Sequence, residues 1–218
     1  VPFTKSFARM SADSFASGVL SSALKARLVV VGADFRFGAK RRGDAAFLEA
    51  AGRRLGFRTI AVPPLLEEGA PVSSSRIRTT LLSGNVEEAA RLLGRPYEIE
   101  GDVVSGSGRG RTLGFPTANL ASPNEILPPG VFATRLFRKG KTWNSVTNVG
   151  RRPTFGASEP SVETHILDAS PLLYGAYLRL TFVARLRDER VFRSSRALAG
   201  AIRADIAAAR RIFGRFGL

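Results

Sequence analysis

A glycine-rich segment near the middle of the chain has the residue types of an anion-binding loop. Gly106, Gly108 and Gly110 stand at alternate positions, where glycine permits positive φ and a close approach of the backbone to a ligand. Successive exposed N–H groups in such a loop form a concave site for anions, and Arg109 and Arg111 add positive charge. The spacing suits a polyphosphate, although it matches neither the GxxxxGKS/T phosphate loop nor the GxGxxG fingerprint. On composition alone, a flexible hairpin is the simpler interpretation.

Two neutral oxygen ligands follow this loop, at Thr117 and Asn119. One residue separates them, so in an extended segment both side chains point to the same face. A hydroxyl and a carboxamide oxygen beside a phosphate loop suit Mg²⁺, which keeps waters and substrate phosphates as its remaining ligands. The alternative is a turn stabilised by Thr and Asn, with no metal.

A carboxylate with a possible catalytic role lies in the segment VETHI, residues 162–166. Alternation along a strand places Glu163 and His165 on one face and Thr164 with its apolar neighbours on the other. Phosphoryl transfer to an alcohol needs a carboxylate that accepts the hydroxyl proton, and Glu163 fits that role. Spacing alone does not separate this base from a structurally paired carboxylate, and His165 is expected to be structural.

Composition excludes several other classes of site and partner. The 218 residues contain no cysteine and a single histidine, which excludes disulfides, thiolate sites and zinc clusters. The net charge of +15 comes mainly from arginines scattered along the whole chain, so no nucleic-acid partner is expected. No apolar run reaches the ~18 residues of a membrane span. We therefore expect a soluble, cytoplasmic protein without a membrane partner, and the oligomeric state stays open.

The first 95 residues have the pattern of an α/β domain. Helical spacing after the N-cap Ser11 predicts a helix over 11–24, and a second helix is expected over 44–55. Short apolar strands at 27–31 and 57–62 flank the second helix, which gives a βαβ unit. Two further helices are predicted before Gly94, the first opened by the serines at 73–75 and expected to turn Leu82 inward.

Strands without intervening helices dominate the rest of the chain, residues 96–218. They are expected at 97–104, 130–137, 143–149, 161–167 and 176–184. Such spacing indicates a small antiparallel barrel or sandwich. Apolar residues repeat at helical spacing from Ser195 onward, which predicts a terminal helix packed on the strands.

This second part resembles the riboflavin kinase module of the bacterial bifunctional riboflavin kinase/FMN adenylyltransferases, the prokaryotic FAD synthetases. The resemblance rests on several motifs in the family's order: GSGRGRTLGFPTANL (106–120), PPGVFA (128–133), NVGRRPTF (148–155), VETHILD (162–168), LYG (173–175) and LRDERVF (186–192). It implies a six-stranded antiparallel Greek-key β-barrel with a C-terminal helix. It also implies phosphorylation of riboflavin to FMN with ATP and Mg²⁺.

The resemblance assigns roles to individual residues. Glu163 is the implied catalytic base, and Thr117 and Asn119 are the implied ligands of Mg²⁺ and nucleotide phosphate. Arg187 and Phe192 lie in the segment that closes over the flavin. The implied ATP-binding and phosphate-binding residues are Gly106, Gly108, Arg109, Gly110, Arg111, Gly114, Pro116, Thr117 and Asn119.

Residues 1–95 resemble the second half of the FMN adenylyltransferase module, a Rossmann-like nucleotidyltransferase domain. The matching segments are VVVGADFRFGAKRRGD (29–44) and SSSRIR (73–78). The implied remnant of the site comprises Asp34, Phe35, Phe37, Ser73, Ser74, Arg76 and Arg78. Simpler interpretations exist for both segments. Residues 34–37 could be a loop buried in the core, and residues 73–78 could serve only as the N-cap of a helix. A partial domain of this kind is expected to expose apolar surface.

The family's HxGH motif is absent, because the only histidine, His165, lies in the kinase part. We expect a domain that lacks its first strand and catalytic motif, so the 218-residue chain should form no FAD. Incubation with FMN, ATP and Mg²⁺ followed by chromatography tests this, and robust FAD formation would contradict it.

Two other classes of function compete with a kinase. The first is a non-catalytic module that binds flavin or nucleotide, although the presence of Thr117, Asn119 and Glu163 argues against it. The second is a nucleic-acid-binding protein driven by the positive charge. A binding titration against salt separates it, because phosphate contacts give a steep salt dependence.

Overall fold

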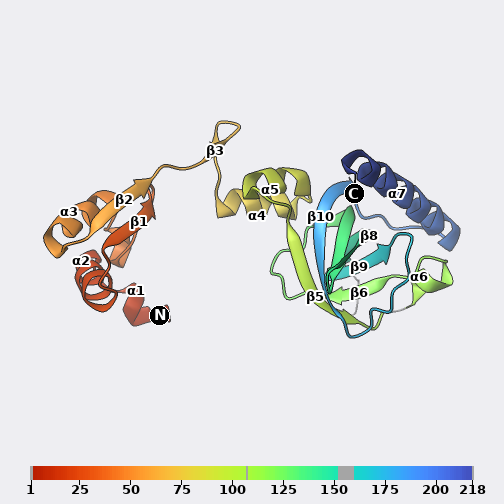
Figure 1. Ribbon diagram of the computed structural model, residues 1–218, viewed down its shortest axis with the longest axis horizontal. Coiled ribbons are helices and arrows are strands. Elements are labelled where there is room, and N and C mark those ends of the chain that lie inside the picture. Colours follow the sequence, from red (N-terminus) through yellow and green to blue (C-terminus); the bar gives the residue numbers. More distant parts are fainter. Residues whose placement is uncertain (1, 107, 152–159, 218) are drawn as a thin grey trace. The chain divides into compact units, whose positions relative to one another are not determined.

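Two compact units make up the chain, one spanning Val1–Val72 and the other Ser73–Leu218. The computed structural model describes residues 2–106, 108–151 and 160–217 (Figure 1). Within these residues, no helix is both long enough and apolar enough to cross a membrane. Each unit has its own apolar core, and the two are described in turn.

The first unit is built around the predicted βαβ element. Its elements are α1 (Lys5–Ala8), α2 (Ala12–Ser14), the π-helix η1 (Phe15–Ala23), β1 (Leu28–Gly32), the 3-10 helix η2 (Ala39–Arg41), α3 (Ala45–Leu55), β2 (Arg58–Val62), β3 (Leu66–Glu67) and β4 (Ala70–Pro71). Strands β1 and β2 pair in parallel, with α3 connecting them, so the βαβ prediction is confirmed. The Asp44 side chain accepts the N–H of Phe47 at 2.8 Å and caps α3, and Gly56 ends it with a left-handed φ of 83°.

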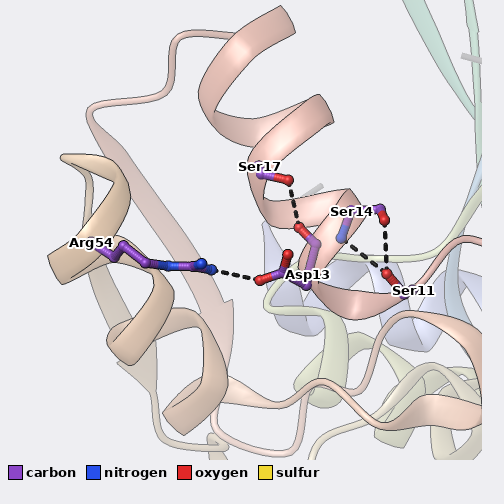
Figure 2. A network of polar contacts seen from close by, with 5 residues as sticks. All are labelled: Ser11, Asp13, Ser14, Ser17 and Arg54. Atoms are coloured by element: carbon purple, nitrogen blue, oxygen red, sulfur yellow. Dashed lines mark hydrogen bonds and ion pairs between the residues drawn. The ribbon is translucent and has the colours of Figure 1, made fainter.

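A network of polar side chains fixes the start of α2 and joins it to α3 (Figure 2). Ser11 is the N-cap, as predicted, and its Oγ accepts the N–H of Ser14 at 3.0 Å. The Asp13 carboxylate pairs with the Arg54 guanidinium of α3 at 2.5 Å. The Ser17 hydroxyl donates to the Asp13 carbonyl at 2.8 Å. These contacts link the first turn of one helix to the last turn of the other.

The two faces of the β1–β2 sheet differ in their surroundings. Val29 and Val31 pack against the apolar cluster that contains Leu48 and Phe57. The alternate positions of both strands are 42 to 57% exposed, and they are Leu28, Val30, Ile60 and Val62. Parallel sheets are normally covered on both faces, so this open face is unusual. The prediction that this part exposes apolar surface is confirmed.

The helices α4 (Ser74–Leu82) and α5 (Val86–Leu93) belong to the second unit. Val86 is buried within the main apolar cluster of the barrel, and Glu87 Oε1 accepts the backbone N–H of Arg185 at 2.8 Å. The domain boundary predicted near residue 95 therefore falls inside this compact unit. The prediction for Leu82 is wrong, because that side chain is 59% exposed and Thr80 is buried on the same helix.

A closed six-stranded antiparallel barrel forms the body of the second unit (Figure 1). Its strands are β5 (Glu98–Val104), β6 (Ala118–Ala121), β7 (Gly130–Arg138), β8 (Lys141–Arg151), β9 (Pro160–Ile166) and β10 (Tyr177–Arg187). They pair in the order β10-β5-β6-β9-β8-β7. Strands β7, β8 and β9 follow one another and β10 returns beside β7, which is a Greek key. The predicted barrel and its five strands are confirmed, and four-residue β6 is too short for an alternation signal.

The barrel has an inner core and a second apolar layer under the terminal helix α7 (Ser195–Phe216). Phe132, Leu180 and Phe182 point inward and are at most 1% exposed. Val131 lies next to Phe132 in β7 and faces outward, where it packs with Phe213 of α7. The helix therefore covers one outer face of the barrel, as the sequence predicts.

Candidate active site

Three polar side chains lie in one register row across neighbouring strands of the barrel. Glu163 of β9 is paired with Asn119 of β6 on one side and with Asn148 of β8 on the other. Adjacent strands lie about 4.8 Å apart, so both carboxamides are direct neighbours of the carboxylate. Glu163 is half-buried, and the buried residues Val162 and Thr164 on either side of it face inward. The predicted alternation in VETHI is confirmed, and Glu163 is on the outer face.

A cavity of ≈ 280 Å³ opens beside this row. Asn119 and Thr117 both line it, as expected from their spacing, together with Arg111 and Pro116 of the glycine loop. Thr164 lines the same cavity from the barrel interior, and Glu163 is in the next position along that strand. The structure thus gathers the predicted metal ligands and part of the predicted phosphate loop in one place, with the predicted base beside them.

The glycine loop is more ordered than a flexible hairpin. It contains the one-turn helix α6 (Arg109–Thr112), and the N–H groups of residues 111–115 donate to carbonyls of Gly108, Gly110 and Arg111. These five N–H groups are therefore already engaged by carbonyls of the loop itself. Gly108 and Gly114 have left-handed φ values of 72° and 84°. The side chain of Arg109 lies outside what the structure describes.

Gly106 is needed for a different reason, which is space. A Cβ atom at this position would collide with the carboxamide of Asn119. The start of the glycine loop therefore packs directly on a predicted metal ligand. The register of β5 and β6, which pairs Val104 with Asn119, explains why Gly106 lies beside a residue thirteen positions further along the chain.

His165 has a structural role in the described contacts. Its Nδ1 lies 2.8 Å from the carbonyl oxygen of Pro116, so Nδ1 donates to that carbonyl. The ring also packs edge-on against Phe115 at 5.9 Å. These contacts hold the end of the glycine loop against β9, which agrees with the expectation that His165 is structural.

The two predicted flavin-binding residues, Arg187 and Phe192, lie close together and already have contacts within the protein. Arg187 donates from Nε and Nη2 to both carboxylate oxygens of Asp205 in α7, at 2.9 and 2.7 Å. Its Nη1 donates to the carbonyl of Asp188 at 2.8 Å, and its guanidinium carbon lies 5.6 Å from the ring centre of Phe192. Asp205 lies outside the sequence motifs, and its partner Arg187 is 18 residues away. The sequence therefore gives no local signal for this ion pair. The predicted contact of Arg187 and Phe192 with flavin remains a prediction.

The segment after β10 also reaches the face that carries Glu163. A Cβ atom at Gly150 of β8 would collide with the Glu189 carboxylate, so Glu189 lies over that glycine. Gly150 is two residues from Asn148, and alternation places both on the same face. Asn148 is a site residue that sequence reasoning missed as an individual candidate, although it begins one of the motifs.

The residues predicted as a remnant adenylyltransferase site are divided between the two units. Phe37 is 9% exposed and stacks with Phe35 at 5.5 Å, so both belong to the core of the first unit beside the exposed Asp34. In the second unit, Ser73 caps α4 by accepting the N–H of Arg76 at 3.2 Å. The Arg76 guanidinium pairs with Glu88 at 3.5 Å, and Ser74 and Arg78 are exposed. The simpler interpretations, a loop buried in the core and a helix N-cap, account for these contacts.

Barrel, glycine loop and outward carboxylate together define a riboflavin kinase domain, and residues 93–213 match the riboflavin kinase family. Residues 1–76 match the FAD synthetase family. The chain belongs to the family of bifunctional riboflavin kinase/FMN adenylyltransferases. The member from Escherichia coli K12 is 38% identical over 98% of this chain and 69% of its own length. The member from Haemophilus influenzae is 35% identical over 97% of this chain and 69% of its own length.

A solved structure gives the same result for the fold. A crystal structure described as a macrolide-efflux protein from Streptococcus pneumoniae has a TM-score of 0.87 and 33% identity to this chain. The similarity covers 95% of this chain and 67% of that one. The family match and the relatives confirm the predicted family and the kinase class within FMN and FAD biosynthesis, and the strand pairing confirms the barrel fold.

Proposed function

We propose that residues 96–218, supported by α4 and α5, transfer the γ-phosphoryl group of ATP to the 5′-hydroxyl of riboflavin. The observation that carries this proposal is the register row in which Glu163 stands between Asn119 and Asn148, beside the cavity lined by Thr117 and Asn119. A base for the alcohol and ligands for the nucleotide are thus on adjacent strands. Both substrates are small molecules, and we expect the reaction to occur in the cytoplasm without a nucleic-acid or membrane partner.

In this mechanism the Glu163 carboxylate accepts the proton of the 5′-hydroxyl as its oxygen attacks the γ-phosphorus. The bond between that phosphorus and the β–γ bridging oxygen breaks, and ADP leaves with the electron pair. The products are FMN and ADP, and the proton remains on Glu163 until solvent removes it. Because Asn119 and Asn148 flank the carboxylate, their carboxamides can orient it toward the alcohol.

Thr117 and Asn119 are the proposed ligands of a Mg²⁺ ion. No group of three or more His, Cys, Asp or Glu residues suited to a metal occurs in the described parts of the chain. A hydroxyl and a carboxamide fit a magnesium ion whose other ligands are water and phosphate oxygens. When bound, the ion would neutralise part of the negative charge of the nucleotide phosphates. Arg111, which lines the same cavity, adds a fixed positive charge for the nucleotide phosphates.

Conversion of riboflavin and ATP to FMN and ADP by the purified chain tests the proposal. Chromatography should show equimolar FMN and ADP, with no FMN when ATP is omitted. A chain that binds riboflavin and ATP but forms no FMN would instead support the non-catalytic binding module.

Substitution of Asn119 by Ala is expected to weaken binding of Mg–ATP by about tenfold or more, because it removes a metal ligand oxygen. Isothermal calorimetry with a non-hydrolysable ATP analogue in the presence of Mg²⁺ measures this change. The control is the same titration without metal, in which wild type and variant should bind almost equally. An equal loss of affinity with and without Mg²⁺ would contradict the metal assignment.

A further inference from the structure

The interior of the barrel contains a chain of four hydroxyl side chains. Thr134 of β7, Ser145 and Thr147 of β8, and Thr164 of β9 are each at most 1% exposed. The Oγ of Thr134 lies 2.8 Å from that of Ser145 and 2.6 Å from that of Thr147. Thr147 then donates to Thr164 at 2.9 Å. Hydroxyls buried in an apolar core are costly unless they are paired, so this chain needs an explanation beyond packing.

The last bond fixes the direction of the chain. Each hydroxyl has one proton, and the proton of Thr147 is used on Thr164. With that proton used, the contact of 2.6 Å between Thr134 and Thr147 is satisfied when Thr134 donates to Thr147, in place of its longer contact of 3.5 Å to the Ser145 carbonyl. Thr164 consequently receives a hydrogen bond and keeps its own proton. In the described parts of the chain, the bond from Thr147 is the one hydrogen bond found for the Thr164 side chain.

Thr164 is also the member of the chain that reaches the cavity. It lines the ≈ 280 Å³ space together with Thr117 and Asn119, whereas Thr134 and Thr147 do not. Much of the surrounding wall is apolar, including Val103 and Ile166. A few polar groups in a mostly apolar wall are the usual means by which a pocket fixes the orientation of a ligand, and the Thr164 hydroxyl is one of them here.

We propose that Thr164 is a specificity-determining residue that donates a hydrogen bond to an acceptor atom of the bound nucleotide. This inference rests on the proposed kinase function. The nucleotide is favoured over the flavin because Thr164 shares its cavity with Arg111, Thr117 and Asn119, the residues proposed for Mg²⁺ and the nucleotide phosphates, whereas Glu163 is not among the residues that line it. Thr147, directly behind Thr164, donates to it and so leaves the Thr164 proton for the ligand.

Two isosteric substitutions separate this role from a structural one. Thr164→Val is expected to raise the KM for ATP and the Kd of a non-hydrolysable ATP analogue about five- to tenfold, the range of one neutral hydrogen bond. The KM for riboflavin should stay within about twofold. Thr134→Val is the matched control: it removes a fully buried hydroxyl of the same chain, so it should lower the melting temperature similarly and leave ATP affinity unchanged.

Three results would overturn the proposal. The first is wild-type affinity for the ATP analogue in Thr164→Val. The second is an increase in the KM for riboflavin in place of that for ATP. The third is an equal loss of ATP affinity in Thr134→Val, which would indicate a general effect of core packing. Thr164→Ser should restore affinity, because it keeps the donor. Since wild-type FMN formation is measured in parallel, failure of this inference is distinguishable from failure of the proposed function.

Discussion

Substitution of Glu163 by Gln is expected to lower kcat for FMN formation by about 10²- to 10⁴-fold. The carboxamide keeps the size of the side chain and its place between Asn119 and Asn148, but it cannot accept the hydroxyl proton. Binding of Mg–ATP should be nearly unchanged, because Glu163 is not among the residues that line the nucleotide cavity. Single-turnover kinetics and calorimetry with an ATP analogue measure the two effects separately.

The matched control for this experiment is Glu125→Gln, which removes one negative charge from an exposed position outside the site. It should retain wild-type kcat. The base assignment is wrong if Glu163→Gln turns over at the wild-type rate. A variant that loses ATP affinity together with kcat would instead place Glu163 at the nucleotide, as a group that orients Asn119.

The fold was largely predictable because its elements carry strong local patterns. Strands β7, β8 and β10 are long and bounded by turn residues, and α7 begins at a serine N-cap whose Oγ accepts the N–H of Ala197. Elements without a periodic pattern were not predictable. Strand β6 has four residues, and α6 forms a single turn in a loop rich in glycine, where local propensity favours disorder. The exposure of Leu82 also depends on which face of α4 packs against α5, which no local pattern specifies.

The site was predictable only in part, for a related reason. Spacing could place Thr117 and Asn119 on one face, and alternation could separate Glu163 from Thr164, because both properties are local. The pairing of Glu163 with Asn119 and Asn148 depends on register between distant segments, which local patterns do not specify. The assignments of Glu163 as the base and of Arg187 and Phe192 to a flavin segment came from the family resemblance and remain predictions.

The buried pair of Arg187 and Asp205 links the predicted flavin segment to α7, and breaking it is expected to have the largest effect on stability. Their side chains are 14% and 8% exposed, and the contact is bidentate. Asp205→Ala should lower the free energy of unfolding by about 3 to 5 kcal/mol, because it leaves a guanidinium buried without its counter-charge. Urea denaturation measures this loss. Arg210→Ala is the control, since its pair with Asp168 is 59% and 70% exposed and should contribute less than about 1 kcal/mol.

A double substitution separates the structural role of this pair from a role in flavin binding. Arg187→Met with Asp205→Leu removes both charges and keeps apolar volume, so most of the stability lost in Asp205→Ala should return. If Arg187 also contacts flavin, the KM for riboflavin should stay elevated in the stable double variant, because the guanidinium is absent. A double variant with both wild-type stability and wild-type KM would show that Arg187 only anchors α7. The free energy of unfolding could instead fall equally in Asp205→Ala and in the double variant. That result would contradict the role of the unpaired buried charge, because the stability would then be lost through packing.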